Sequence, residues 1–182
     1  MATEVSRVGD SMRTYTGVRF YPSDPRPDEI FIQDIAHSLS NMCRFAGHVK
    51  EFYSVAEHSV RVSLACHPDD ALWGLLHDAS EAYVVDMPRP IKRAPFMHGY
   101  RLLEAKVSLA VCERFELPLD QPSSVTLADD ILLATEARDL MCWDIDQWAP
   151  MPEPLQEVIK PLSPVEAKRW FIYRFDELTG NL

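Results

Sequence analysis

Apolar residues recur at intervals of three and four along most of the chain after residue 28, which is the spacing of an amphipathic helix. This pattern predicts a first helix over residues 32–43. Ser54 and Glu57 then form the Ser-x-x-Glu signal of a capping box, so a second helix should begin at Val55. A third helix is expected over residues 69–83, where the same spacing returns.

The second half of the chain continues the helical pattern after one interruption. Residues 86–92 contain two prolines, and we expect them to leave the helix because proline cannot donate a backbone hydrogen bond. Further helices are predicted over residues 100–115 and 125–143, and a second capping box at residues 163–166 opens a last helix that closes near Gly180. No run of alternating apolar residues is long enough to predict a strand, so the predicted fold class is all-α.

Two regions differ in composition. Residues 1–27 are polar and punctuated by prolines, and they predict an irregular N-terminal arm. Residues 28–182 predict a single compact helical domain, because a chain of 182 residues suffices for one core. Candidate metal ligands fall on three of its helices, and helical bundles build metal sites in this way.

The formal net charge of −10 argues against a nucleic-acid polymer or an anionic membrane as partner, since both need a broad basic surface. A small anionic substrate remains compatible if a local group of cations holds it. The chain has no apolar span of membrane length and no signal peptide, so we expect a cytoplasmic protein. The cysteines lie far apart and predict reduced core residues: Cys43, Cys66, Cys112 and Cys142.

The most informative motif is the His77-Asp78 doublet at the end of an apolar run. Burying two ionisable groups is costly unless something compensates, and a metal ion is the usual compensation. His58 upstream and Asp129 downstream would complete a mixed set of imidazole and carboxylate donors. Such a set suits one divalent ion, and zinc, cobalt, manganese and iron all tolerate it. Spacing alone leaves Asp130 open as an alternative to Asp129.

Five short motifs follow one another along the chain: Arg44-Phe45, Tyr53-Ser54-Val55-Ala56-Glu57-His58-Ser59, His77-Asp78-Ala79-Ser80-Glu81, Asp86-x-Pro-x-Pro-x-Lys92 and Ala128-Asp129. In this order they resemble the HD-domain phosphohydrolase superfamily, whose signature is a His, a His-Asp pair and a distant Asp around a divalent metal. They are similar to bacterial 5′-deoxynucleotidases and to the small phage dATP triphosphohydrolases of viruses with 2-aminoadenine DNA. Residues 34–48 fit the phage-type branch best, and the resemblance covers residues 28–142.

The resemblance implies an HD-type helical bundle in which the metal site lies between helices. The implied ligands are His58, His77, Asp78 and Asp129, with Asp129 preferred over its neighbour. The resemblance also assigns Glu81 an acid/base role. Its spacing from His77 fits, because residues four apart share one face of a helix and the carboxylate would lie one turn from the metal.

The resemblance further implies where the sugar of a nucleotide would lie. Asp86 would face the 3′-hydroxyl or the leaving oxygen, although a turn residue that ends a helix is the plainer interpretation. Phe45 would pack against the sugar where a 2′-hydroxyl would sit, although an ordinary core phenylalanine fits the sequence equally well.

Arg44 and Lys92 are the cations that we expect to hold phosphate, since a helix end and a proline-spaced turn would fix their positions. Arg89 and Lys50 are weaker candidates. Triphosphohydrolases of this kind can carry a further cation shortly before the last metal-binding Asp. Residues 124–127 read Ser-Val-Thr-Leu and depart from that pattern.

These features predict a metal-dependent deoxynucleotide phosphohydrolase, with dATP as the expected substrate and deoxyadenosine and triphosphate as products. Two alternatives stay open: a 5′-deoxynucleotidase limited to monophosphates, and a non-catalytic HD domain that binds a nucleotide as a regulator. Glu81 and Lys92 argue against the regulator, because binding alone needs no acid/base group beside the metal. Family members assemble as dimers or hexamers, so the resemblance implies a homo-oligomer.

Overall fold

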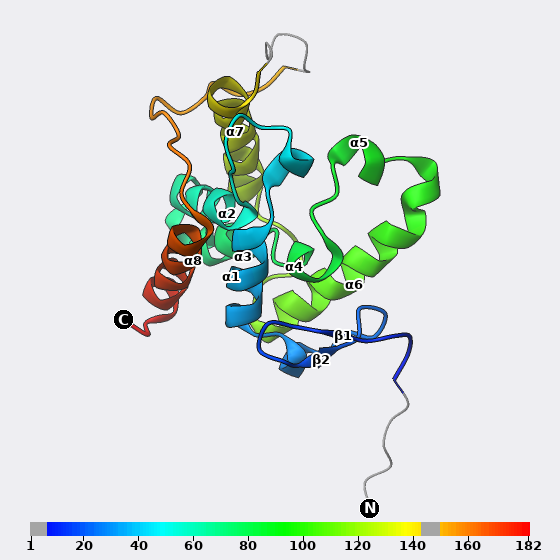
Figure 1. The fold of residues 1–182 in the computed structure, drawn as a ribbon. Helices are drawn as coiled ribbons and strands as arrows, with labels where there is room; N and C mark the ends of the chain where they lie inside the picture. The colour runs from blue at the N-terminus through cyan, green and yellow to red at the C-terminus, as the bar shows by residue number, and fades with distance from the viewer. Residues whose placement is uncertain (1–6, 143–149) are drawn as a thin grey trace, which may run out of the picture.

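Helices form most of the regular structure in residues 7–142 and 150–182, the part of the chain that a computed structural model describes (Figure 1). The predicted all-α fold class is confirmed. Within these residues the one sheet is an antiparallel hairpin of β1 (Met12–Arg13) and β2 (Arg19–Phe20). The sequence pattern does not predict this hairpin, because strands of two residues are too short to show alternation. The N-terminal arm is therefore less irregular than expected.

The hairpin is fixed to the helices through Phe20. This side chain is fully buried, and its ring stacks on that of Tyr83 with centroids 4.2 Å apart. A 3-10 turn, η1 (Pro27–Glu29), then leads into the first helix. The arm is thus part of the core packing.

Helix α2 (Val55–Ala65) is the centre of the fold. Eight of its 11 residues are buried, and one of them is His58. Burial is this extensive because four helices pack against it: α1 (Ile32–Asn41), α3 (Ala71–Leu76), α7 (Ser123–Leu140) and α8 (Pro164–Thr179). A residue on α2 therefore lies within reach of side chains from distant parts of the sequence.

Both predicted capping boxes lie at helix starts. At α8 the box is complete, since Ser163 and Glu166 exchange side-chain and backbone hydrogen bonds. At α2 the Glu57 amide donates to the Ser54 hydroxyl over 3.1 Å. The Glu57 carboxylate, however, accepts from Arg61 on the next turn, so this box is formed on one side.

The prediction of one helix over residues 69–83 is wrong. A 3-10 turn, η3 (Pro68–Asp70), precedes α3, residues 77–80 form turns, and α4 (Glu81–Val84) follows. Backbone bonds in the break span three residues instead of four, as from the Ala79 amide to the Leu76 carbonyl oxygen (2.9 Å). The dihedral angles at either side of the break stay helical, so the apolar spacing does not reveal it.

Other helix ends also differ from the predictions. Helix α1 ends at Asn41, because Cys43 pairs with Ser54 in an isolated β-bridge. The segment after α4 leaves the helix as expected, but residues 89–92 form a short helix, α5 (Arg89–Lys92), with proline in the first turn, where it is tolerated. Helix α7 ends at Leu140, and the expected end at residue 143 lies outside the described residues.

The third long helix, α6 (His98–Arg114), follows a 3-10 turn, η4 (Pro95–Met97), and begins slightly before its predicted start. The cysteines are free, as expected. The prediction that all of them are core residues is wrong, because Cys112 is buried whereas Cys142 is exposed. Among the described residues, no helix has the length and apolar character needed to cross a bilayer.

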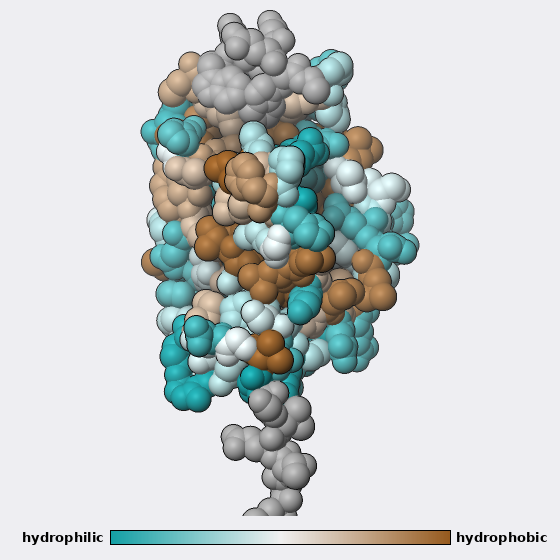
Figure 2. All heavy atoms as spheres, turned by 90° about the vertical axis from the view of Figure 1, so that its right-hand side faces the viewer, coloured by the Kyte–Doolittle hydropathy of each residue, from teal (hydrophilic) through white to brown (hydrophobic). Residues whose placement is uncertain are grey.

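Exposed apolar side chains gather on the face of the molecule that Figure 2 shows. The exposed large apolar residues of α5, η4 and α6 are Ile91, Phe96, Leu102 and Leu109. Apolar patches of this kind are typical of interaction surfaces. The homo-oligomer stays a prediction.

Gly74 sets how closely α3 approaches α2. A Cβ atom there would lie 2.8 Å from the Cys66 Sγ and 3.1 Å from the Ser63 Cα. We expect Gly74→Ala to lower the free energy of unfolding by about 1–3 kcal/mol, the usual cost of overpacking, in urea denaturation. Gly99→Ala is the control, because a Cβ at that position meets no atom within 4 Å. Equal effects of the two substitutions would contradict the packing argument.

Candidate metal centre and pocket

Three helices bring two imidazoles and one carboxylate together. His58 lies in the first turn of α2 and is fully buried, His77 directly follows α3, and Asp129 lies on α7. The two Nε2 atoms are 3.3 Å apart, and the His58 Nε2 is 3.2 Å from the Asp129 Oδ1. These three groups could hold one metal ion.

Asp78, the fourth expected ligand, lies at the edge of this cluster. Its Oδ2 is 3.2 Å from the His77 Nε2 and 3.8 Å from the His58 Nε2, so it can add a second carboxylate. Asp129 reaches the cluster and Asp130 does not belong to it, because a helix turns neighbouring side chains about 100° apart. The structure thereby favours Asp129 over Asp130, between which the sequence spacing could not decide.

The hydrogen bonds of the two imidazole rings determine which ring nitrogens carry a proton and which have a lone pair for a metal. The His77 Nδ1 is 2.8 Å from the Gly74 carbonyl oxygen, which can only accept, so this nitrogen carries the proton. The His58 Nδ1 donates in the same way to the Glu136 Oε1 over 2.6 Å. In neutral rings both Nε2 atoms then present lone pairs to one another beside carboxylates. Such an arrangement is repulsive unless a cation lies between them, so the donor set fits a divalent ion.

The pKa values show that the cluster attracts positive charge. Burial and Arg44 lower the pKa of His58, but Glu136 and Asp129 outweigh them and raise it to about 9. Burial would raise the pKa of Asp78 and of Asp129, but the imidazoles hold both well below the ordinary value. The carboxylates are therefore ionised and available as ligands.

Arg44 is held by the carboxylates of this centre. It begins a 3-10 turn, η2 (Arg44–Gly47), and its guanidinium lies 3.1 Å from the Glu136 Oε2 and 3.5 Å from the Asp78 Oδ2. Phe45 follows with a left-handed φ of 56°, and its ring centroid is 5.1 Å from the Arg44 guanidinium carbon. The predicted contacts of these two residues with phosphate and sugar stay predictions.

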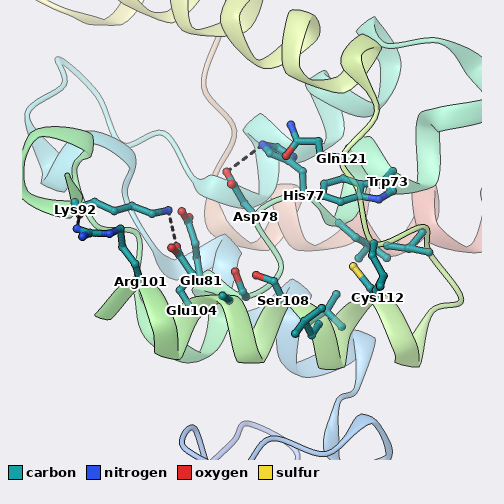
Figure 3. A pocket seen from close by; sticks show the side chains of 17 residues that line it. Trp73, His77, Asp78, Glu81, Lys92, Arg101, Glu104, Ser108, Cys112 and Gln121 are labelled. Carbon is teal, nitrogen blue, oxygen red and sulfur yellow. Dashed lines mark hydrogen bonds and ion pairs between the residues drawn. The ribbon is translucent and has the colours of Figure 1, made fainter. Parts of the chain in front are cut away.

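A pocket of about 470 Å³ runs past the candidate metal ligands along α6 (Figure 3). His77 and Asp78 line its middle, and Lys92 and Arg101 lie together toward one end. The opposite end is apolar and lies beside Trp73. The pocket therefore offers cations on one side of the centre and an apolar wall on the other.

Glu81 begins α4 and lines the same pocket, but it is only 7% exposed. Its Oε2 has no hydrogen-bond partner among the described residues. Burial raises the pKa of Glu81 well above its ordinary value, and the negative charges of Asp78 and Asp86 raise it further. Burial and Asp78 also raise the pKa of Asp86, so this residue belongs to the same electrostatic environment. Glu81 is thus suited to carry a proton.

The predicted phosphate-binding cations differ in their surroundings. Lys92 reaches the pocket, where its Nζ is 2.5 Å from the Glu104 Oε1. Arg89 lies 3.8 Å from the Asp129 Oδ2, whereas Lys50 borders a separate small pocket. Arg101 is a pocket cation that sequence reasoning misses, because it stands in an ordinary helical stretch without a motif.

Glu136 is a second residue to which sequence reasoning assigns no role. It is fully buried and joins His58 to Arg44. Burial would raise the pKa of Glu136, but these two partners lower it. One signal could have found it: Glu136 follows Asp129 by seven residues, so both lie on one face of α7, two turns apart.

No family model matches the chain. YfdR, an uncharacterized protein of Escherichia coli (strain K12), is 40% identical to it over 173 residues, which cover 92% of this chain and 95% of YfdR. This chain belongs to the YfdR family. A second member, an uncharacterized protein of Rhodobacter capsulatus, is 36% identical over 141 residues, which cover 70% of this chain and 71% of the relative.

Loss of one ligand tests the metal centre of this YfdR-family protein. We expect Asp129→Asn to lower the affinity for Co²⁺ at least about tenfold, because an amide is a much poorer ligand than a carboxylate. Isothermal titration calorimetry with Co²⁺ measures this affinity. Asp130→Asn removes the same charge from the adjacent position and should bind as the wild type does; a larger loss for Asp130→Asn would refute the assignment.

Proposed function

We propose that this protein is a metal-dependent phosphohydrolase of the HD-domain type that acts on deoxynucleotides. The observation that carries the proposal is the meeting of His58, His77 and Asp129 beside a pocket that also holds the buried Glu81. Metal-binding side chains, a protonatable carboxyl and pocket cations are the groups that metal-dependent hydrolysis of a phosphate ester needs. The order of the sequence motifs adds the resemblance to known enzymes of this type.

For dATP the proposed reaction joins the oxygen of water to the α-phosphorus and breaks the bond to the 5′-oxygen, which gives deoxyadenosine and triphosphate. A divalent ion bound at the centre would supply Lewis acidity to the water and to a phosphoryl oxygen. Glu81 would give a proton to the departing 5′-oxygen, a task for which a raised pKa suits it. Lys92 and Arg101 would hold phosphate oxygens at the cationic end of the pocket.

Two other functions remain as alternatives. A 5′-deoxynucleotidase would use the same centre on a monophosphate, and the pairing of Lys92 with Glu104 favours it, because a neutralised lysine attracts a phosphate chain less. Arg101 favours the longer chain, since it adds a second cation beside Lys92. A regulator that only binds nucleotides would not need a buried, unpartnered carboxyl in the pocket.

The acid/base role of Glu81 is tested by Glu81→Gln. We expect turnover of dATP to fall by about 10²–10⁴-fold, the usual contribution of a general acid or base, while Co²⁺ binding stays intact. Turnover is measured from the deoxyadenosine released, and metal content from the same samples. Should the variant keep most of its turnover with full metal content, the proton would be handled elsewhere, with Asp86 as the next candidate.

Phosphate recognition is tested by Lys92→Ala, compared on dATP and dAMP. We expect kcat/KM for dATP to fall roughly 10- to 100-fold, the value of about 1.5–3 kcal/mol from a charged hydrogen bond, with a smaller loss for dAMP. Arg93→Ala is the matched control, because this adjacent side chain is exposed.

The substrate that is hydrolysed distinguishes the candidate functions: hydrolysis of dAMP with none of dATP would assign the monophosphate branch. Equal rates on ATP and dATP would remove the sugar-sensing role of Phe45.

A further inference from the structure

Glu136 is buried at the back of the metal centre, where the proposed reaction does not use it. Its side chain has no exposed surface, and its two oxygens serve two different partners. Oε1 accepts from the His58 Nδ1 over 2.6 Å, and Oε2 accepts from the Arg44 guanidinium over 3.1 Å. Desolvation strongly disfavours an ionised carboxylate in such a place unless both partners compensate it.

We propose that Glu136 is a positioning residue that holds His58 with its Nε2 toward the metal. The inference rests on the metal centre of the proposed function. Because a carboxylate only accepts, the His58 Nδ1 must donate to it, and the lone pair is left on Nε2, 3.3 Å from the Nε2 of His77. Arg44 keeps the carboxylate ionised and in place from its other side.

The substitution Glu136→Gln should undo this arrangement. An amide has one acceptor, which the guanidinium of Arg44 requires, so the NH₂ group is left to face the His58 Nδ1. That contact favours the ring form that carries its proton on Nε2. A protonated Nε2 has no lone pair for the metal. We expect the affinity for Co²⁺ to fall roughly 10- to 100-fold, as for other outer partners of metal-binding histidines, and the Co²⁺ absorption spectrum to change.

Glu57→Gln is a close control. Glu57 is also a fully buried glutamate paired with an arginine, and it precedes His58 on α2, but its carboxylate faces Arg61 and the Leu162 amide. This variant should lose stability and keep the wild-type Co²⁺ affinity and spectrum. Thermal melting of each metal-free variant, monitored by circular dichroism, establishes that it is folded before titration.

Co²⁺ titration of the wild type, Glu136→Gln and Glu57→Gln decides the inference. Wild-type affinity in Glu136→Gln overturns it, and so does an equal loss in both variants, which would reflect a lost buried charge. If Glu136→Gln does not fold, Glu136→Asp replaces it: its shorter side chain keeps the charge but withdraws it from Nδ1, and unchanged affinity there overturns the inference too. A wild type that binds no Co²⁺ overturns the metal centre as well. A wild type that binds Co²⁺ but hydrolyses no deoxynucleotide refutes the proposed function alone.

Discussion

Two imidazole Nε2 atoms 3.3 Å apart, whose lone pairs face one another when both rings are neutral, are the constraint on which the candidate centre depends. Neither ring can turn away, because the Gly74 carbonyl holds His77 and the Glu136 carboxylate holds His58. The repulsion between the lone pairs must be balanced by a proton or a metal ion. The fold therefore arranges the three side chains in advance, which would reduce the entropy lost if a metal ion bound there.

The packing of α2 maintains this arrangement. The helix is buried against α3 at Gly74 and against α7, so the backbones that carry His58, His77 and Asp129 are fixed by apolar contacts. Burying polar groups in such a core is unfavourable unless they have partners, as His58 and Glu136 have in one another. Among the described residues, four buried polar atoms lack a hydrogen-bond partner: the Arg44 Nε, the Tyr53 and Tyr83 hydroxyls and the Glu81 Oε2. Of these residues, Glu81 lines the pocket. An unsatisfied buried oxygen at the edge of a pocket is a group whose partner can be a ligand.

The sequence predicted the helices well where their apolar spacing is long, as in α6 and α8, and where a capping box marks the start. It failed where a tertiary contact decides. The turns at residues 77–80 keep helical spacing, and the hairpin in the arm depends on Phe20 entering a core formed by later helices. For the candidate centre, the sequence motifs named His58 and His77, and their spacing left Asp129 and Asp130 open. Sequence reasoning gave no role to Glu136: the spacing of seven from Asp129 places both on one face of α7, but the need for a buried carboxylate appears only when His58 and Arg44 lie beside it.

Charge balance explains why a divalent ion suits this centre. Asp78, Asp129 and Glu136 have lowered pKa values and are ionised, and Arg44 offsets one of them. Two negative charges therefore surround the two imidazoles when these are neutral, as binding a metal requires. A divalent ion cancels this charge, whereas a monovalent ion would leave one charge uncompensated in a region of low dielectric. At the cationic end of the pocket Lys92 and Arg101 face Glu104 and Glu81. Burial raises the pKa of Glu81, so a positive charge remains there while that carboxyl is protonated. A phosphate group would thus meet a neutral centre and a positive wall, although the whole chain carries a net charge of −10.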